Sequence, residues 1–270
     1  MGLFTQCGNK TIIGMVHVKA LPGTPNYSGQ TEAIYQLALS EAKLFEALKF
    51  DAIIIENMHD VPYLNRNVGP EVTATMAVIA TKICDSIQIP CGIQILAGAN
   101  KEALAVAHSA NLAFIRAEGF VYSHVADEGL MDGHAGELLR YRKSIGASHI
   151  EIFTDVQKKH SSHAITNDLS ISDHIKAAEF FLSDGIIITG SSTGKTANIE
   201  DVKKAKEVST KPVLIGSGVS DKNINEYWEY ADGFIVGSSL KEENHWANPI
   251  DRKKAELFIK EAMRLRKLHD

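Results

Sequence analysis

Two short turns of glycine and serine near the carboxyl end of the chain carry the clearest chemical signal in the sequence. Residues 213–219 read VLIGSGV and residues 233–239 read GFIVGSS, so each apolar run ends in a Gly-Ser turn. Glycine lets backbone approach a ligand closely, and exposed amides beside serine hydroxyls suit an anion. The turns therefore predict a phosphate site formed by Gly216, Ser217, Gly218, Gly237 and Ser238.

Three carboxylates follow other apolar runs, at positions where acid–base chemistry could be placed. Glu56 ends the run AIIIE, Asp155 ends IFTD, and Glu118 follows a strand-like run by one residue. A carboxylate at the end of a buried strand needs a partner. Each is therefore either a catalytic acid or base or one half of a structural ion pair, and we predict the catalytic role for all three.

Lysines accompany these carboxylates. We predict Lys19 and Lys158 as catalytic cations that stabilise a developing oxyanion. Lys158 or its neighbour Lys159 could instead form a Schiff base with a carbonyl, or remain solvated.

Other polar residues at the ends of apolar runs are predicted to bind substrate: His17, Asn57, Asn100 and Arg116. Each has an alternative structural interpretation. Asn100 would also serve as the N-cap of the next helix. Arg116 would also pair with Glu118, which lies on the same side of a strand.

The segment GSSTGKT at residues 190–196 resembles a Walker A loop but is not one. The motif requires four residues between its glycines, and here three separate them. Its hydroxyls and glycines still suit a phosphate or sugar, so we predict that Thr193 and Gly194 bind substrate.

A divalent metal is possible but not specified. Histidines and carboxylates with hard-ligand character gather among the predicted strand ends, namely His17, Glu56, His59, Glu118 and Asp155. They come from separate strands, and no HxH or HxxxH spacing supports them. We therefore assign no metal ligand, and no cofactor is firmly implied by the sequence.

The elements that must position these residues alternate along the whole chain. Strands are predicted at 11–18, 51–56, 91–96, 113–117, 149–154, 185–189, 212–216 and 233–237. Helical patterns at 31–49, 69–86, 100–110, 134–145, 172–184, 198–208, 222–230 and from about 248 follow them. Eight such units predict a (β/α)₈ barrel, whose active face is built from the loops after the strands.

Composition bounds the class of protein. The 270 residues contain 44% hydrophobic and 23% charged residues, which suits one barrel domain spanning residues 1–270. A net charge of −5 gives no general attraction to nucleic acid. No apolar run approaches the ~18 residues of a membrane span, and three scattered cysteines fit a reduced, cytoplasmic protein.

With these motifs in view, nearly the whole chain resembles the BtpA/SgcQ family. The resemblance is carried by IGMVH at 13–17 with LPG at 21–23, by GPE at 69–71, by RAE at 116–118, and by NPID at 248–251. It implies a barrel similar to the ribulose-phosphate-binding barrels. The family takes its name from a cyanobacterial protein needed for photosystem I accumulation, and the resemblance fixes no reaction.

Two classes of function therefore stay open. One is an enzyme that acts on a small phosphorylated sugar or nucleoside as an isomerase, epimerase or aldol-type lyase, through carboxylate acid–base chemistry. The other is a non-catalytic assembly or stability factor, which a large exposed apolar patch away from the barrel mouth would favour. We expect a small phosphorylated ligand as partner, and a homo-oligomer.

Overall fold

The computed structural model describes residues 2–7, 10–190 and 192–269, and its centre is a closed barrel of parallel strands in the order β1-β11-β10-β9-β7-β4-β3-β2. The strands are β1 Thr11–His17, β2 Ala52–Glu56, β3 Cys91–Gln94, β4 Phe114–Ala117, β7 Glu151–Val156, β9 Gly185–Ile188, β10 Val213–Ile215 and β11 Gly233–Val236. Each overlaps a predicted strand, and the predicted (β/α)₈ barrel is confirmed.

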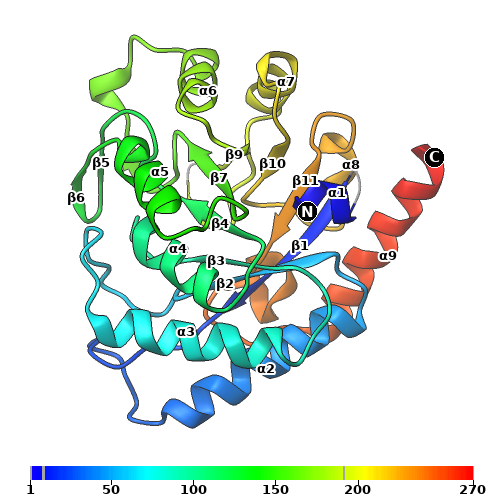
Figure 1. Cartoon of the computed structure of the whole chain (residues 1–270). Helices are drawn as coiled ribbons and strands as arrows, with labels where there is room; N and C mark the ends of the chain where they lie inside the picture. The colour runs from blue at the N-terminus through cyan, green and yellow to red at the C-terminus, as the bar shows by residue number, and fades with distance from the viewer. Residues whose placement is uncertain (1, 8–9, 191, 270) are drawn as a thin grey trace.

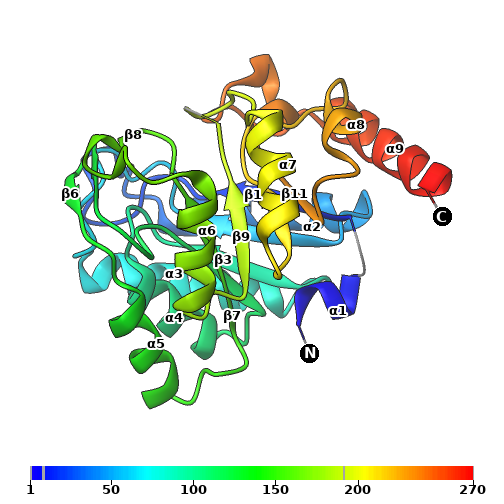
Figure 2. The same ribbon diagram turned by 90° about the horizontal axis from the view of Figure 1, so that it is seen from above.

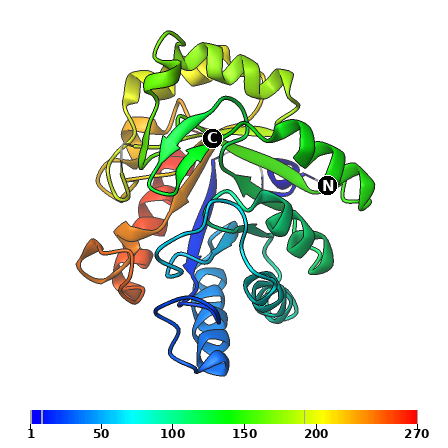
Figure 3. The same cartoon turned by 90° about the vertical axis from the view of Figure 1, so that its left-hand side faces the viewer.

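Helices surround the barrel in chain order (Figure 1). They are α2 Thr31–Ala47, α3 Pro70–Cys84, α4 Asn100–Ser109, α5 Ala135–Ser144, α6 Ile171–Phe180, α7 Ile199–Val208, α8 Ile224–Tyr227 and α9 Arg252–His269. In Figure 3 the colours run around the barrel from blue through green to red, so each helix lies beside the next in sequence. None of these helices combines the length and apolar character that crossing a membrane requires, within the described ranges.

Several short elements were not expected from the sequence. Helix α1, Leu3–Cys7, closes the amino-terminal end of the barrel, where Leu3 is fully buried. A small antiparallel sheet of β5 His124–Ala126, β6 Gly129–Met131 and β8 Ser161–Ser162 lies on the side of the molecule away from α9 (Figure 2). The 3-10 turns are η1 Ala164–Thr166, η2 Ser238–Leu240 and η3 Glu242–Asn244. Elements of two to five residues are too short for a periodic pattern to reveal.

Alternation along each strand decides which side chains enter the barrel. In β1, Ile13 and Met15 belong to the inner core cluster, whereas Ile12 and Val16 pack outward against the helices. The next inward position after Met15 is His17, and in β2 the inward position after Ile54 is Glu56. The last inward residues of these strands therefore lie at the mouth of the barrel. The expectation of a single domain over 1–270 reaches beyond the described residues and stays a prediction.

Candidate functional site

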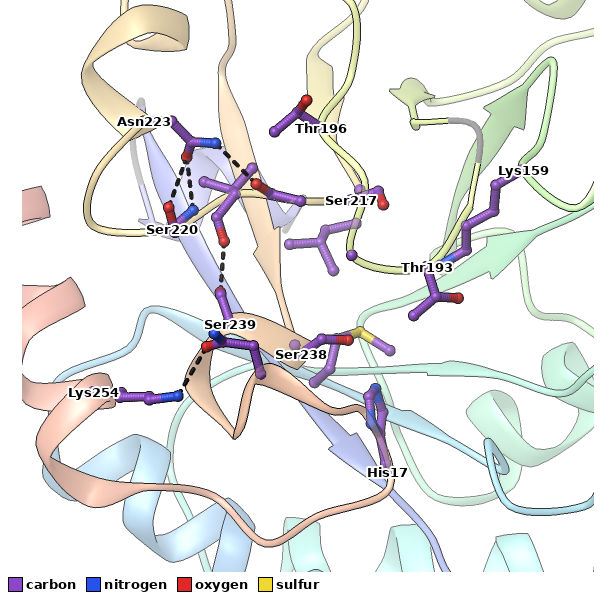
Figure 4. A pocket seen from close by; sticks show the side chains of 18 of the residues that line it. His17, Lys159, Thr193, Thr196, Ser217, Ser220, Asn223, Ser238, Ser239 and Lys254 are labelled. Atoms are coloured by element: carbon purple, nitrogen blue, oxygen red, sulfur yellow. Dashed lines mark hydrogen bonds between the residues drawn. The ribbon is translucent and has the colours of Figure 1, made fainter. Parts of the chain in front are cut away.

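A cavity of about 500 Å³ opens at the carboxyl ends of the barrel strands. Its size suits a small ligand. Figure 4 shows His17 and Ser238 at one part of its wall and Thr193 with Lys159 at another. Ten of the predicted site residues line it: His17, Glu56, Arg116, Thr193, Gly194, Gly216, Ser217, Gly218, Gly237 and Ser238.

His17 and Glu56 face each other at the base of this cavity. His17 Nε2 lies 3.6 Å from Glu56 Oε2, and both side chains are buried. His17 Nδ1 lies 3.0 Å from the carbonyl oxygen of Trp246. Because a carbonyl only accepts, Nδ1 carries the ring proton and Nε2 presents a lone pair toward Glu56. A gap of 3.6 Å is too long for a hydrogen bond, so an oxygen of a ligand can bridge the two groups.

Burial moves the pKa values of this pair in opposite directions. It lowers the pKa of His17 to about 3, assisted by the positive charge of Lys241. It also raises the pKa of Glu56, against the opposing charges of Arg116 and Lys159. Near neutral pH His17 is therefore a neutral base, and Glu56 is shifted toward its protonated form. One group can accept a proton while the other donates one.

Arg116 is held by a two-pronged ion pair. Its NH2 nitrogen donates to Asp155 Oδ1 at 2.8 Å and its Nε donates to Oδ2 at 3.0 Å. Burial opposes the positive charge, but the pull of Asp155 dominates and raises the pKa of Arg116 overall. Arg116 lines the cavity and Asp155 does not. The geometry makes Asp155 the residue that orients Arg116, while its predicted catalytic role stays a prediction.

Glu118 and Lys158 turn toward each other instead of toward the cavity. Lys158 Nζ lies 3.4 Å from Glu118 Oε2 and 3.9 Å from Glu128 Oε2, with all three side chains buried. Of the predicted residues Glu56, Arg116, Glu118 and Asp155, only the first two line the cavity. Glu118 sits two residues past Arg116, beyond the end of β4, where strand alternation no longer fixes direction.

The remaining predicted residues contact their own chain. The Asn100 amide donates to the Glu118 carbonyl at 2.7 Å and accepts from the Glu118 amide at 3.2 Å. Asn57 accepts from the Leu96 amide at 2.7 Å. Lys19 Nζ donates to the Ala247 carbonyl at 3.0 Å. None of these three side chains lines the cavity.

The wall beside β10 and β11 is built from loops with small residues. Ser217 Oγ donates to the Lys195 carbonyl at 2.9 Å, which ties the loop after β10 to the loop after β9. The hydroxyl of Ser238 has no partner among the described residues and remains able to donate to a ligand. Gly237 leaves room for about one more atom, since an added Cβ would lie in ordinary contact, 3.4 Å from His17 and Met15. The predicted phosphate site thus stays a prediction with suitable geometry.

The cavity also contains residues outside the predicted site, namely Met15, Thr196, Ser220, Asn223, Ser239 and Lys254. It further contains Lys159, which the sequence offered only as an alternative to Lys158. Met15 could have been found, because it shares the inward face of β1 with His17. Nothing in the sequence separates Lys159 from Lys158. Gln157, just before them, has a φ of 50°, which breaks the alternation of the strand.

The described residues do not form a recognisable metal site. Across residues 2–7, 10–190 and 192–269, no three His, Cys, Asp or Glu side chains form a group that could hold a metal ion. A divalent ion at this mouth stays an untested prediction.

Solved structures with similar backbones are barrels of the same kind. Orotidine 5'-monophosphate decarboxylase from Methanocaldococcus jannaschii is similar with a TM-score of 0.59 and 14% identity, covering 94% of this chain and 98% of that one. Phosphoribosyl anthranilate isomerase from Thermus thermophilus is similar with a TM-score of 0.58 and 12% identity, covering 95% and 100%. At such low identity the likeness establishes the fold alone.

Sequence relatives extend over almost the whole chain. An uncharacterised protein of Caenorhabditis elegans, described as mitochondrial, is 47% identical over 261 residues, covering 95% of this chain and 94% of the relative. The photosystem I biogenesis protein BtpA of Synechocystis is 36% identical over 255 residues, covering 93% and 87%. A model of the BtpA family matches residues 8–264, and this chain therefore belongs to the BtpA family.

Proposed function

We propose that the protein is an enzyme that acts on a small phosphorylated sugar or nucleoside by moving a proton between Glu56, His17 and the substrate. The observation that carries the proposal is the pair itself: two buried groups, 3.6 Å apart in one cavity, with opposite pKa shifts. Isomerases, epimerases and aldol-type lyases share this need for a proton to leave one atom and return at another.

The proton transfer follows from the fixed tautomer. His17 Nε2 takes a proton from a carbon next to a carbonyl, and protonated Glu56 gives its proton to the carbonyl oxygen. The products are an imidazolium and a carboxylate, whose attraction in a water-poor site lowers the cost of both charges. Arg116, oriented by Asp155, supplies a further positive charge at the same wall.

The phosphate of the substrate would lie against the loops after β10 and β11. Gly237, with space for close approach, and Ser238, with its unpartnered hydroxyl, support this placement. Similar barrels bear names of enzymes for phosphorylated compounds, including a thiamine phosphate pyrophosphorylase from Pyrococcus furiosus. A ligand a few carbons long then spans from these loops to the His17–Glu56 pair.

The test begins with a thermal-shift screen over phosphosugars and nucleotides. A ligand at about 100 times its Kd adds roughly 2.7 kcal/mol of stability. Ligands that stabilise the protein are then incubated with it in D₂O, and proton NMR follows the loss of C–H signals. We expect enzyme-dependent exchange at a carbon beside the carbonyl.

The control is Glu207→Gln, a surface carboxylate whose partner Lys204 lies 2.9 Å away, far from the chemistry proposed here. It should exchange protons at the wild-type rate. A screen that finds a stabilising phosphosugar with no exchange and no turnover would contradict proton-transfer catalysis.

A second candidate function is supported by a different surface. At the end of α6, Phe180, Phe181 and Leu182 are 81%, 44% and 64% exposed. This run of apolar side chains lies away from the barrel mouth, as an assembly or stability factor would require. In cells that lack the protein, Phe180→Ser would then fail to restore function where Glu56→Gln succeeds; the reverse result favours the enzyme.

A further inference from the structure

Lys159 differs from the buried lysines near the barrel mouth because its amine has no partner among the residues that the structure describes. Lys158 lies beside Glu118, and Lys241 Nζ lies 3.2 Å from Glu41 Oε1. Within the described ranges, the Lys159 amine makes no hydrogen bond or ion pair. Only the Lys159 backbone is bonded: its N–H donates to Thr189 Oγ1 at 3.2 Å, and its carbonyl accepts from Ser161 Oγ at 3.3 Å. Its partly buried side chain lines the cavity, and Figure 4 shows it extending toward Thr193.

The surroundings of this amine favour its neutral form. Burial removes water from the ammonium group, and the nearby charge of Arg116 repels it. Together they lower the pKa of Lys159, although Glu56, Asp155 and Glu118 oppose the change. A neutral lysine amine in a cavity is a nucleophile toward carbonyl carbon.

We propose that Lys159 forms an imine with the carbonyl carbon of an open-chain phosphorylated aldose or ketose. The inference rests on the proposed function and narrows its substrate to compounds with a free aldehyde or ketone. A lysine placed only to bind phosphate would serve as well in its charged form, so the two roles can be separated by chemistry.

The step balances without an outside oxidant or reductant. The Nζ lone pair attacks the carbonyl carbon, forming a C–N bond while the carbonyl oxygen takes a proton from Glu56. The nitrogen then passes one of its two protons to the hydroxyl oxygen, the C–O bond breaks and the oxygen leaves as water, so the nitrogen keeps one proton in a protonated imine. The protonated imine then draws electrons from a neighbouring C–H bond, whose proton His17 accepts. In a lyase it instead draws them from the C–C bond to a hydroxyl-bearing carbon, which leaves as an aldehyde while His17 accepts the hydroxyl proton. Such a sequence fits an aldol-type lyase or an imine-assisted isomerase.

The experiment traps the imine by reduction. The full chain is incubated with dihydroxyacetone phosphate, glyceraldehyde 3-phosphate or ribose 5-phosphate, and sodium borohydride is then added. Intact and peptide mass spectrometry should find the mass of one reduced adduct, located on Lys159. Lys159→Arg keeps the positive charge but cannot form the imine, so the adduct should be lost. Lys204→Arg, at an exposed lysine paired with Glu207, is the control and should keep it.

Failure of the imine and failure of the proposed function give different results. Proton exchange in D₂O without any adduct on Lys159 overturns the imine and leaves proton-transfer catalysis in place. An adduct that persists in Lys159→Arg also overturns it, because another lysine is then the target. An adduct on Lys159 without proton exchange supports the imine and contradicts the role assigned to His17.

Discussion

The two halves of the barrel mouth differ in the residues that end their strands: ionisable side chains in one half and glycines in the other. At the ends of β1, β2, β4 and β7 the last inward residues are His17, Glu56, Arg116 and Asp155, all buried and all ionisable. At the ends of β10 and β11 the corresponding residues are Gly216 and Gly237, with no side chain. One half is filled by ionisable side chains, two of which form the Arg116–Asp155 ion pair, and the other half ends in glycines.

This difference explains where the cavity lies and how each half should respond to change. The charged half holds its side chains through mutual contacts, such as the Arg116–Asp155 pair, so its geometry fails when a partner is removed. The glycine half holds its shape through backbone contacts between loops, so it fails when bulk is added. In the function proposed above, the first half carries the chemistry and the second accommodates the ligand.

The largest expected effect comes from Glu56→Gln. The amide copies the shape of the protonated acid but cannot donate its proton, so turnover of a substrate should fall by roughly 10²–10⁴ while binding is retained. Burial raises the pKa of Glu56. Ionising this carboxylate therefore makes the folded state less stable as pH rises through the pKa of Glu56 in the folded protein. The variant should therefore be at least as stable as the wild type at pH 7, as measured by urea unfolding. Unchanged turnover would remove Glu56 from the chemistry.

Breaking the Arg116–Asp155 ion pair should mainly lower the free energy of unfolding. Asp155→Ala leaves Arg116 buried without its partner, which costs about 3–5 kcal/mol of unfolding free energy. Replacing both residues by apolar ones, Arg116→Met with Asp155→Leu, should recover part of that loss. Equal destabilisation of the single and double variants would show that the unpaired charge is not the cause.

The sequence predicts the barrel and the residues at its strand ends, but it does not predict which polar side chains pair at the mouth. Strands buried on both faces read as apolar runs, so the eight units and the inward position of Glu56 follow from local pattern. The carbonyl of Trp246, which fixes the tautomer of His17, lies 229 residues away in the chain. The direction of the Lys159 side chain depends on a positive φ at Gln157, which no pattern in the sequence predicts. Local periodicity therefore gives the elements, whereas the protonation and orientation of the site come from contacts between distant loops.

Acid should lower the stability of the folded protein because His17 is buried in its neutral form. Its pKa is about 3 in the folded protein and 6.5 in the unfolded chain, so between these values the unfolded state binds more protons. Wild-type stability should thus fall as pH drops from 6.5 toward 3, by about 1.4 kcal/mol for each unit of pKa difference that is realised. His17→Asn removes this contribution, and the other histidines are common to both proteins. Unfolding curves from pH 4 to 8 should show a shallower acid loss in the variant; parallel curves would contradict the buried neutral state.

The smallest effects separate two glycines of the open half. At Gly216 an added Cβ would come within 2.6 Å of Ile187 Cγ2, so Gly216→Ala should cost about 1–3 kcal/mol through overpacking. At Gly237 the nearest atoms would be 3.4 Å away, an ordinary contact, so Gly237→Ala should leave the unfolding transition nearly unchanged. Gly218 cannot serve here, because its φ of 67° and the Lys195 backbone 2.4 Å from an added Cβ already forbid a side chain.

Gly237→Ala therefore tests ligand space without disturbing the fold. If a phosphate group approaches the backbone at this position, the added methyl must weaken binding of a phosphate ester, measured by calorimetry with the ligand found in the thermal-shift screen. The Glu207→Gln protein gives the reference affinity. A Gly237→Ala variant that folds normally and binds the ester as tightly as the reference would move the phosphate away from the loop after β11. It would then have to lie nearer the loop of Thr193 and Gly194, and the division between a charged half and a ligand-accommodating half would no longer follow the strand ends.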